Sequence, residues 1–247
     1  MSTMVSARQL LTRSLRGEVS YGAVSGTIVH TDEQTAGRAR GPSRTWAADP
    51  GSSLLATIIL HRSDLPPAPA ASLVVGWAAA AAVAEQLSAS TSRGADGISL
   101  KWPNDIFLDD RKLGGVLVET AGQDWLLAGI GINLTSCPPD ETLRTPATFL
   151  GAAGCTPNRD DLLSAILTNL HAAAGYTVNR LLDSINGYMR YLNYRVVLHQ
   201  GKNRIHGRFS GIGPEGEALI EAKGETIHCF SGEMEPDQAA AGSPVSL

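Results

Sequence analysis

The sequence of 247 residues predicts an α+β protein, with a mixed β-sheet and packed helices over residues 1–191 and a small β-barrel over residues 192–237. Up to about residue 191, apolar runs of strand length alternate with longer segments whose apolar residues recur at helical spacing. From residue 194 onwards the segments become short and alternating, and glycines separate them.

The chain opens with a predicted helix, a strand and a loop. Residues Met4–Leu15 place their apolar side chains close to helical spacing, which predicts a short amphipathic helix. The β-branched segment Val24–His30 runs into polar residues and predicts a strand. Residues Gln34–Gly51 are rich in Gly, Arg, Ser and Pro and predict an exposed loop, and Leu54–Leu60 predicts a buried strand.

Helices and strands continue the first part. The prolines at positions 66, 67 and 69 precede a helix at about Ala71–Leu87, whose alanines allow close packing on a sheet. Strands are predicted at Ile98–Trp102 and Trp125–Leu134, with a hairpin between them. Two further helices are predicted at Arg159–Ala174, after a Pro-Asn start signal, and at Asn179–Tyr191.

The C-terminal barrel is predicted from short strands with glycines at their turns. The predicted strands are Arg195–Leu198, Arg204–Phe209, Ala218–Ile220 and Thr226–Phe230. Strands this short need closure to hide their edges, which favours a barrel. The tail 238–247 is rich in Ala, Gly, Ser and Pro and is expected to be disordered.

Composition excludes several classes of protein. The net charge is -4 and no basic run is present, which argues against a general nucleic-acid binder. The 3 cysteines form neither a CxxC nor a zinc pattern and are read as reduced thiols of a cytoplasmic protein. The apolar run Leu73–Ala84 is too short for a membrane span, and the N-terminal residues contain no recognisable secretion signal.

The most informative segment is the hairpin around Lys112. Two apolar runs, 106–108 and 116–118, flank the polar turn Asp109-Asp110-Arg111. Lys112 starts the second strand, and Gly114 and Gly115 follow, so a ligand could approach the backbone beside an ammonium group. This arrangement favours an anion site, although a surface hairpin with a solvated lysine has the same spacing.

Four segments, in order along the chain, resemble the signature of one family. They are DEQTAGRAR at 32–40, KWPND leading to KLGG at 101–115, AGIGIN at 128–133 and SGE at 231–233. Together they resemble the biotin–protein ligases over nearly the whole chain. The resemblance implies a class II synthetase-like catalytic domain and an SH3-like C-terminal barrel, in a monofunctional enzyme without a DNA-binding domain.

The resemblance also implies a reaction and its partners. Biotin would be adenylated with ATP and Mg²⁺ to biotinyl-5′-AMP, and then transferred to a lysine of a biotin carboxyl carrier protein. Charge develops on phosphate and acyl oxygens in these steps, so fixed cations should dominate catalysis. No contact with DNA or a membrane is expected, and the protein is expected to be a monomer or a weak homodimer.

Site residues follow from the same resemblance. Lys112 would reach the biotin carboxylate and the α-phosphate, Arg40 would hold the adenylate, and Asp105 would receive the carrier lysine. The implied biotin site comprises Ser2, Thr3, Gln34, Gly37, Arg38, Lys112, Gly114 and Gly115. The implied ATP and adenylate site comprises Arg38, Arg40, Trp46, Lys101, Asn104, Gly129, Gly131 and Asn133, with Asn104 also a magnesium contact.

The sequence departs from the family pattern in two places. Ala39 replaces a glycine of the arginine-rich loop and Pro42 follows, and both restrict loop conformations. The family has an Asp-Ser-Thr-Asn run at the biotin site, whereas this chain has Ser2 and Thr3 followed by Met4, on an N-terminus expected to be frayed.

Other interpretations remain open from the sequence alone. Trp46 could be a core residue, the Asn104-Asp105 pair a turn cap, and the basic loop merely solvated. A lipoate or octanoyl transferase of the same fold, or a catalytically weak biotin- or adenylate-binding protein, are the alternative functions. Biotin-dependent release of pyrophosphate from ATP distinguishes them from a biotin ligase.

Overall fold

A computed structural model describes residues 1–19, 25–41, 44–66, 70–143 and 145–237, and it confirms the predicted α+β class. The helices are α1 (Thr3–Leu15), α2 (Ala71–Ser90), α3 (Arg159–Ala174) and α4 (Val178–Asn186). Short 3₁₀ helices lie at Arg62–Asp64, Asp140–Thr142 and Leu150–Ala153. Pro42, one of the two loop departures, and the tail 238–247 lie outside the described residues, as does Val24 at the start of the first predicted strand.

The larger sheet has six strands in the order β1-β2-β6-β5-β4-β3. They are β1 (Thr27–Thr31), β2 (Ser53–His61), β3 (Ile98–Lys101), β4 (Asp105–Leu108), β5 (Arg111–Ala121) and β6 (Trp125–Asn133). Every pairing between these strands is antiparallel, so the sheet predicted as mixed is antiparallel in the described chain. Hairpin connections between β3, β4, β5 and β6 account for three of the five pairings, because a tight turn joins only antiparallel neighbours.

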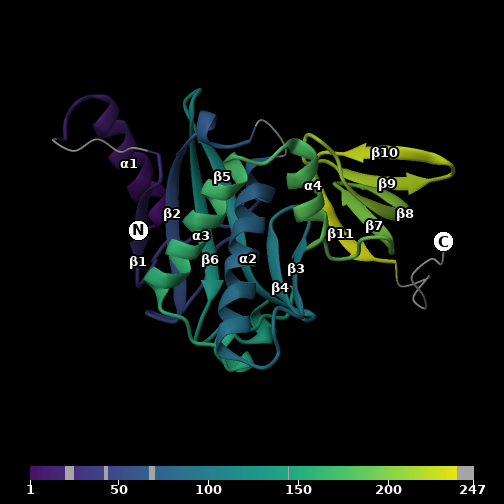
Figure 1. Ribbon diagram of the computed structural model, residues 1–247, viewed down its shortest axis with the longest axis horizontal. Helices are drawn as coiled ribbons and strands as arrows, with labels where there is room; N and C mark the ends of the chain where they lie inside the picture. Colours follow the sequence, from purple (N-terminus) through teal and green to yellow (C-terminus); the bar gives the residue numbers. More distant parts are fainter. Residues whose placement is uncertain (20–24, 42–43, 67–69, 144, 238–247) are drawn as a thin grey trace.

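The two faces of this sheet carry different elements. On β6, Leu126 and Ala128 belong to the main core with α2, while Leu127 packs in a second cluster with α1 residues such as Ala7 and Leu11. Side chains alternate across a strand, so α1 and α2 cover opposite faces. Figure 1 shows α2 and α3 in front of the strands, with α1 at the far edge. Burial on both faces explains the continuous apolar runs of β2 and β6.

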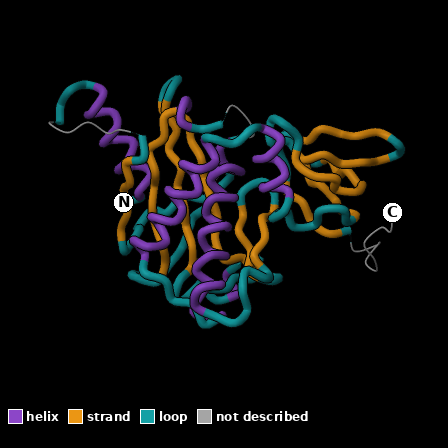
Figure 2. The backbone as a smooth tube through the Cα atoms, in the orientation of Figure 1, coloured by secondary structure: helices purple, strands orange, loops and turns teal. Residues whose placement is uncertain are grey.

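Helix α2 is the central helix of the core. Ala78, Ala79, Ala80 and Ala82 are fully buried, which allows α2 to lie close to the strands and to α3. By length and composition α2 could cross a membrane, but 67% of the relevant window is buried inside the protein, as in a core helix. Figure 2 shows α2 in front of the strands of the larger sheet, and α2 packs against α3.

The C-terminal sheet has five antiparallel strands in the order β10-β9-β8-β7-β11. They are β7 (Arg195–Gln200), β8 (Asn203–Ile212), β9 (Ala218–Ala222), β10 (Glu225–Cys229) and β11 (Glu233–Pro236). The four predicted strands are confirmed, and β11 was missed because its sequence, Glu-Met-Glu-Pro, is short, polar and ends in proline. β11 pairs with β7, next to the first sheet's cavity described below.

Helix α4 ends earlier than the sequence predicted. It stops at Asn186 rather than Tyr191, and Gly187 follows. The next residues pair with β3 instead, since Leu100 N donates to Tyr188 O at 2.7 Å and Arg190 N donates to Leu100 O at 2.8 Å. The proposed domain boundary at residue 191 stays a prediction, because buried side chains of both sheets belong to one core cluster.

Candidate functional site

A cavity of about 1140 Å³ opens on the α1 side of the larger sheet and reaches the C-terminal sheet. It is lined by most of the predicted site residues, which come from the N-terminus, the loop after β1, and strands β3 to β6. These are Thr3, Gln34, Arg38, Arg40, Trp46, Lys101, Asn104, Asp105, Lys112, Gly115, Gly129, Gly131 and Asn133. Segments that are distant in the sequence therefore form one site.

Lys112 is held in place by its backbone on both sides. On one side β5 pairs with β4, and an irregularity in register lets Phe107 face Lys112 while Ile106 faces Gly114. On the other side, Lys112 N donates to Pro146 O at 2.8 Å and Thr148 N donates to Lys112 O at 2.9 Å. An irregularity of this kind re-aims a side chain relative to the regular strand.

The Lys112 ammonium is paired with a carboxylate inside the cavity. Its Nζ lies 2.6 Å from Asp105 Oδ1, and the two side chains are 29% and 25% exposed. A Cβ on Gly115 would lie 3.3 Å from the same carboxylate oxygen and 3.6 Å from Lys112 Cε. Gly115 therefore leaves room for this ion pair, which combines a fixed cation with a group able to accept a proton.

Lys101 supplies a second cation to the cavity, so two of the chain's four lysines lie here. Burial lowers the pKa of Lys101, and so does the charge of Lys112, while nearby carboxylates such as Asp105 act in the opposite direction. Asn104 is fixed close by, because its Nδ2 donates to Val116 O at 2.8 Å and Val116 N donates to Asn104 O at 2.9 Å. Its side-chain oxygen remains the part that could meet a ligand.

Two glycines of β6 leave space for other side chains on the sheet face that borders the cavity. A Cβ on Gly131 would lie 2.6 Å from Trp46 Cε2, and a Cβ on Gly129 would lie 2.9 Å from Met4 Sδ. The Trp46 ring thus rests on the backbone of β6, and its buried Nε1 has no hydrogen-bond partner among the described residues. Asn133, at the end of β6, donates to Thr148 O at 2.9 Å.

The end of the cavity near Met4 combines an apolar wall with one amide. Thr57 Oγ1 donates to Thr3 Oγ1 at 2.8 Å, and Thr3 N donates to Gln34 Oε1 at 3.0 Å. Because Gln34 Oε1 is already engaged, its NH₂ group is the part left for a ligand acceptor. Leu117 and Met4 line the same cavity, so an apolar molecule with a polar head fits this end.

The predicted fraying of the N-terminus is wrong for Ser2 and Thr3. Ser2 is 2% exposed and Thr3 5% exposed. Ser2 is the N-cap of α1, and its Oγ accepts from Val5 N at 3.3 Å. A serine cap satisfies one of the free N–H groups of the first turn, a signal that the sequence contained.

The arginines of the loop after β1 have protein partners. Arg38 forms an ion pair with Glu119, with Nη2 2.9 Å from Oε1. Arg40 Nη1 donates to Gly232 O at 3.1 Å, and Arg44 lies 2.7 Å from a Glu233 carboxylate oxygen. The loop therefore connects the larger sheet to β11 of the C-terminal sheet.

Three predicted residues do not line the cavity. Besides Ser2, they are Gly37 and Gly114, whose hypothetical Cβ atoms would lie 2.3 Å from Trp46 O and 2.6 Å from Gly131 O. Both glycines allow close approach of two backbones, so their role in this structure is to shape the site.

Sequence reasoning missed much of the cavity wall. Missed residues include Met4, Arg44, Ala56, Leu117, Leu143, Thr145, His199, Gly201, Glu233 and Glu235. Most lie on loops or on the short strand β11, where no periodic pattern marks them. The SGE motif at 231–233 was the one sequence feature noted in this part of the wall. It was interpreted as the end of the barrel, and no site role was predicted for its residues.

The chain is similar to known proteins over most of its length. Residues 9–134 match the model of the biotin/lipoate A/B protein ligase family. The biotin–[acetyl-CoA-carboxylase] ligase of Mycobacterium tuberculosis is 30% identical over 226 residues, which cover 85% of this chain and 79% of that protein. The bifunctional ligase/repressor BirA of Escherichia coli is 29% identical, and the match covers 85% of this chain and 66% of BirA. The chain thus spans about two thirds of that relative.

A solved structure agrees with these matches. The biotin protein ligase from Aquifex aeolicus, in complex with biotin and ATP, superposes with a TM-score of 0.72 at 27% identity, covering 95% of this chain and 94% of that one. The predicted family and fold are therefore confirmed. The chain belongs to the biotin/lipoate A/B protein ligase family.

Proposed function

We propose that this protein is an ATP-dependent biotin ligase, which forms biotinyl-5′-adenylate and transfers biotin to a lysine of a biotin carboxyl carrier protein. The observation that carries the proposal is the pairing of Lys112 with Asp105 in a cavity that has an apolar end and a cationic end. Its volume of about 1140 Å³ exceeds the usual range for one small ligand, about 300–1,000 Å³, and suits two substrates side by side.

In the first step, a biotin carboxylate oxygen attacks the α-phosphate and the bond to pyrophosphate breaks. Biotin would occupy the end near Met4 and Leu117, with its polar ring head toward the Gln34 NH₂ group. Its carboxylate would then point toward Lys112, which neutralises charge on the reacting oxygens. Lys101 and Arg40 would hold the phosphates, and Trp46 and Asn133 would contact the nucleotide.

In the second step, the carrier lysine attacks the acyl carbon of the adenylate. The new C–N bond forms, the bond to the AMP oxygen breaks, and the ammonium proton must leave. Asp105 lies 2.6 Å from the Lys112 ammonium and is 25% exposed, which supports a role in receiving the incoming lysine and its proton. The cavity reaches β11, and the carrier would therefore approach along the C-terminal sheet.

Magnesium would enter with the phosphates of ATP. Among the described residues, no group of three His, Cys, Asp or Glu side chains could hold a metal ion by itself. This fits Mg²⁺, which is commonly bound through substrate phosphates and one or two protein oxygens. The side-chain oxygens of Asn104 and Asp105 are the candidates for those contacts, and the ion would neutralise phosphate charge.

One incubation tests the proposed function. The protein is mixed with ATP, magnesium, biotin and a biotin carrier domain, and the mass of the carrier is measured together with released pyrophosphate. We expect a carrier with one added biotinyl group and biotin-dependent pyrophosphate release. Biotin binding without pyrophosphate release would contradict the proposal, and so would preferential transfer of lipoate or octanoate in parallel reactions.

Lys101 should give the reaction an alkaline limit. Its lowered pKa means that it loses its proton at a lower pH than an ordinary lysine, whose pKa is 10.5. Because only the ammonium attracts phosphate, we expect the KM for ATP to rise at alkaline pH, and this rise should begin at a lower pH than it would for an ordinary lysine. Lys101→Arg keeps its charge at alkaline pH, so its KM should change less. An equally steep rise in both proteins would exclude Lys101 as the titrating group.

The predictions about partners and location differ in how they relate to the proposed function. A carrier protein is required as the acceptor, whereas the expected monomer or weak homodimer, the lack of DNA contact and the cytoplasmic location stay predictions. Analytical ultracentrifugation, with and without biotin and ATP, measures the oligomeric state directly.

A further inference from the structure

Glu119 connects three parts of the site without lining the cavity itself. It lies on β5 two residues beyond Leu117, and side chains at this spacing point to the same face of a strand. Its side chain is 21% exposed, and it is shared by Arg38 from the loop after β1 and Arg8 from α1. Gly115 and Leu117 of the same strand face line the cavity.

Arg38 and Glu119 form a two-point contact, in which both terminal nitrogens of the guanidinium meet the two carboxylate oxygens. Arg38 Nη1 donates to Glu119 Oε2 at 3.1 Å, and Arg38 Nη2 lies 2.9 Å from Oε1. A two-point arginine–carboxylate pair fixes orientation as well as distance. Both terminal nitrogens of Arg38 are thus engaged by Glu119, and the segment from Arg38 to Arg40 lines the cavity.

Arg8 extends this connection to the other end of the site. Its Nη2 lies 3.0 Å from Glu119 Oε2 and donates to Thr120 O at 3.1 Å. Helix α1 carries Thr3 and Met4, which form the cavity's apolar end. A single carboxylate therefore ties the apolar end and the arginine-bearing segment to the same strand.

We propose that Glu119 is a positioning residue of the ligase reaction, which acts through Arg38 to hold Arg40 over the bound adenylate and through Arg8 to hold α1. This inference rests on the proposed function. It assigns the Arg38 side chain to Glu119 rather than to a phosphate, and it leaves the chemistry at Lys112 untouched. Loss of Glu119 should therefore affect retention of the adenylate more than its formation.

A double-mutant cycle tests the proposal. Glu119→Gln, Arg38→Ala and the double variant are compared for the rate of adenylate formation and for the rate at which labelled adenylate dissociates. We expect each single variant to release adenylate about 10-fold faster, since small displacements from the bound geometry are costly, while its formation slows less than about threefold. The double variant should match Glu119→Gln within about twofold, because in the proposal Glu119 acts on the loop only through Arg38.

The matched control is Glu221→Gln on the C-terminal sheet. Glu221 forms a comparable ion pair, with Arg208 Nη2 2.6 Å from its carboxylate, and it does not line the cavity. Adenylate release by this variant should equal that of the unmodified protein. Additive effects of Arg38→Ala and Glu119→Gln would instead place Arg38 directly on the ligand and overturn the proposal, as would unchanged release from Glu119→Gln.

A measurement without ligand separates this inference from the proposed function. Limited trypsin digestion should cleave after Arg38 or Arg40 about 10-fold faster in Glu119→Gln than in Glu221→Gln, because the segment loses its anchor and cleavage follows local opening. Equal cleavage rates would overturn the positioning role even if the protein ligates biotin. Absence of adenylate from the unmodified protein would contradict the proposed function alone.

Discussion

Replacing Lys112 by alanine is expected to reduce adenylate formation by about 10²- to 10³-fold, the usual effect of removing one fixed group that stabilises transition-state charge. Lys112 is positioned by backbone bonds to both β4 and the 146–148 segment, so its ammonium needs little reorganisation when charge develops. The measurement is biotin-dependent exchange of pyrophosphate into ATP. The loss should be in the maximal rate, because the interaction strengthens as the reacting oxygens gain charge.

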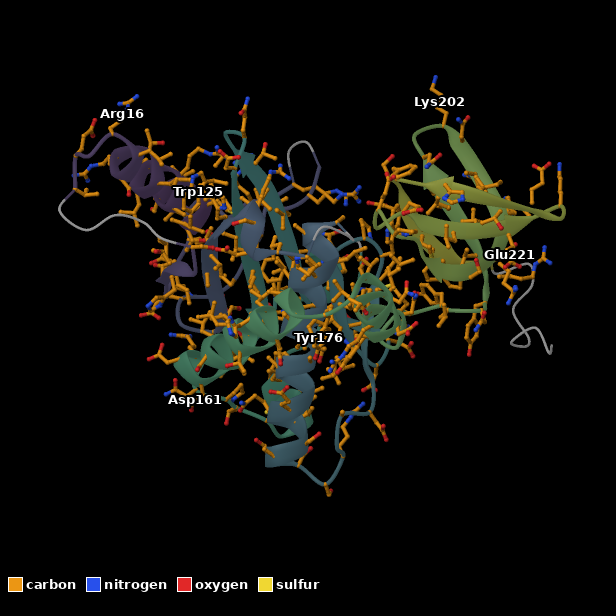
Figure 3. The ribbon with its side chains drawn as sticks, turned by 45° about the horizontal axis from the view of Figure 1, so that its top comes forward. Arg16, Trp125, Asp161, Tyr176, Lys202 and Glu221 are labelled. Atoms are coloured by element: carbon orange, nitrogen blue, oxygen red, sulfur yellow. The ribbon has the colours of Figure 1, made fainter. Side chains whose placement is uncertain are left out.

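The fold of this variant should survive. The Lys112–Asp105 pair is 29% and 25% exposed, and pairs with this access to water contribute only about 0–1 kcal/mol to stability. Lys202→Ala is a matched control, because Lys202 is exposed on the β7–β8 turn and points outward from the C-terminal sheet in Figure 3. A near-normal exchange rate in Lys112→Ala would remove the lysine from its proposed role.

Local pattern was sufficient to predict most of the fold. Strand β2 and helix α3 have clear period and length, and the structure has them at or within one residue of the predicted bounds. The end of α4 was wrong because the residues after Gly187 pair with β3, a contact about 90 residues away in the chain. Helical spacing inside a segment carries no information about such a partner.

In the site too, features set by neighbouring residues were predictable from the sequence, and contacts between distant residues were not. Lys112 and its glycines stand together in the sequence, and their motif predicted a site in the cavity that Lys112 and Gly115 line. The partners of the arginines could not be predicted in this way, because Glu119 and Gly232 lie 81 and 192 residues from Arg38 and Arg40. The wrong prediction for Ser2 had a different cause. Its capping of α1 involves only residues 2–5, so local sequence was sufficient to predict it.

Replacing Gly131 by alanine is expected to weaken ATP binding by about 10- to 100-fold, while biotin binding measured alone stays nearly unchanged. The new Cβ would lie 2.6 Å from Trp46 Cε2 and 2.8 Å from Cζ2, closer than carbon atoms pack. Strand β6 is paired with β2 and β5 on its two sides, so the strand cannot yield. The Trp46 ring must move instead, and it lines the end of the cavity assigned to the nucleotide.

Gly129→Ala provides the matched comparison on the same strand and the same face. Its Cβ would meet Met4 Sδ at 2.9 Å and Met4 Cγ at 3.2 Å, and this flexible side chain would shift at the apolar end of the cavity. We therefore expect Gly129→Ala to weaken biotin binding and to leave the KM for ATP nearly unchanged. Isothermal titration with biotin and steady-state kinetics with ATP measure the two effects separately. The methyl group added at position 131 would displace Trp46, and the one added at position 129 would displace Met4. If both variants weakened the binding of the same ligand, the assignment of the cavity's two ends to biotin and nucleotide would therefore be wrong.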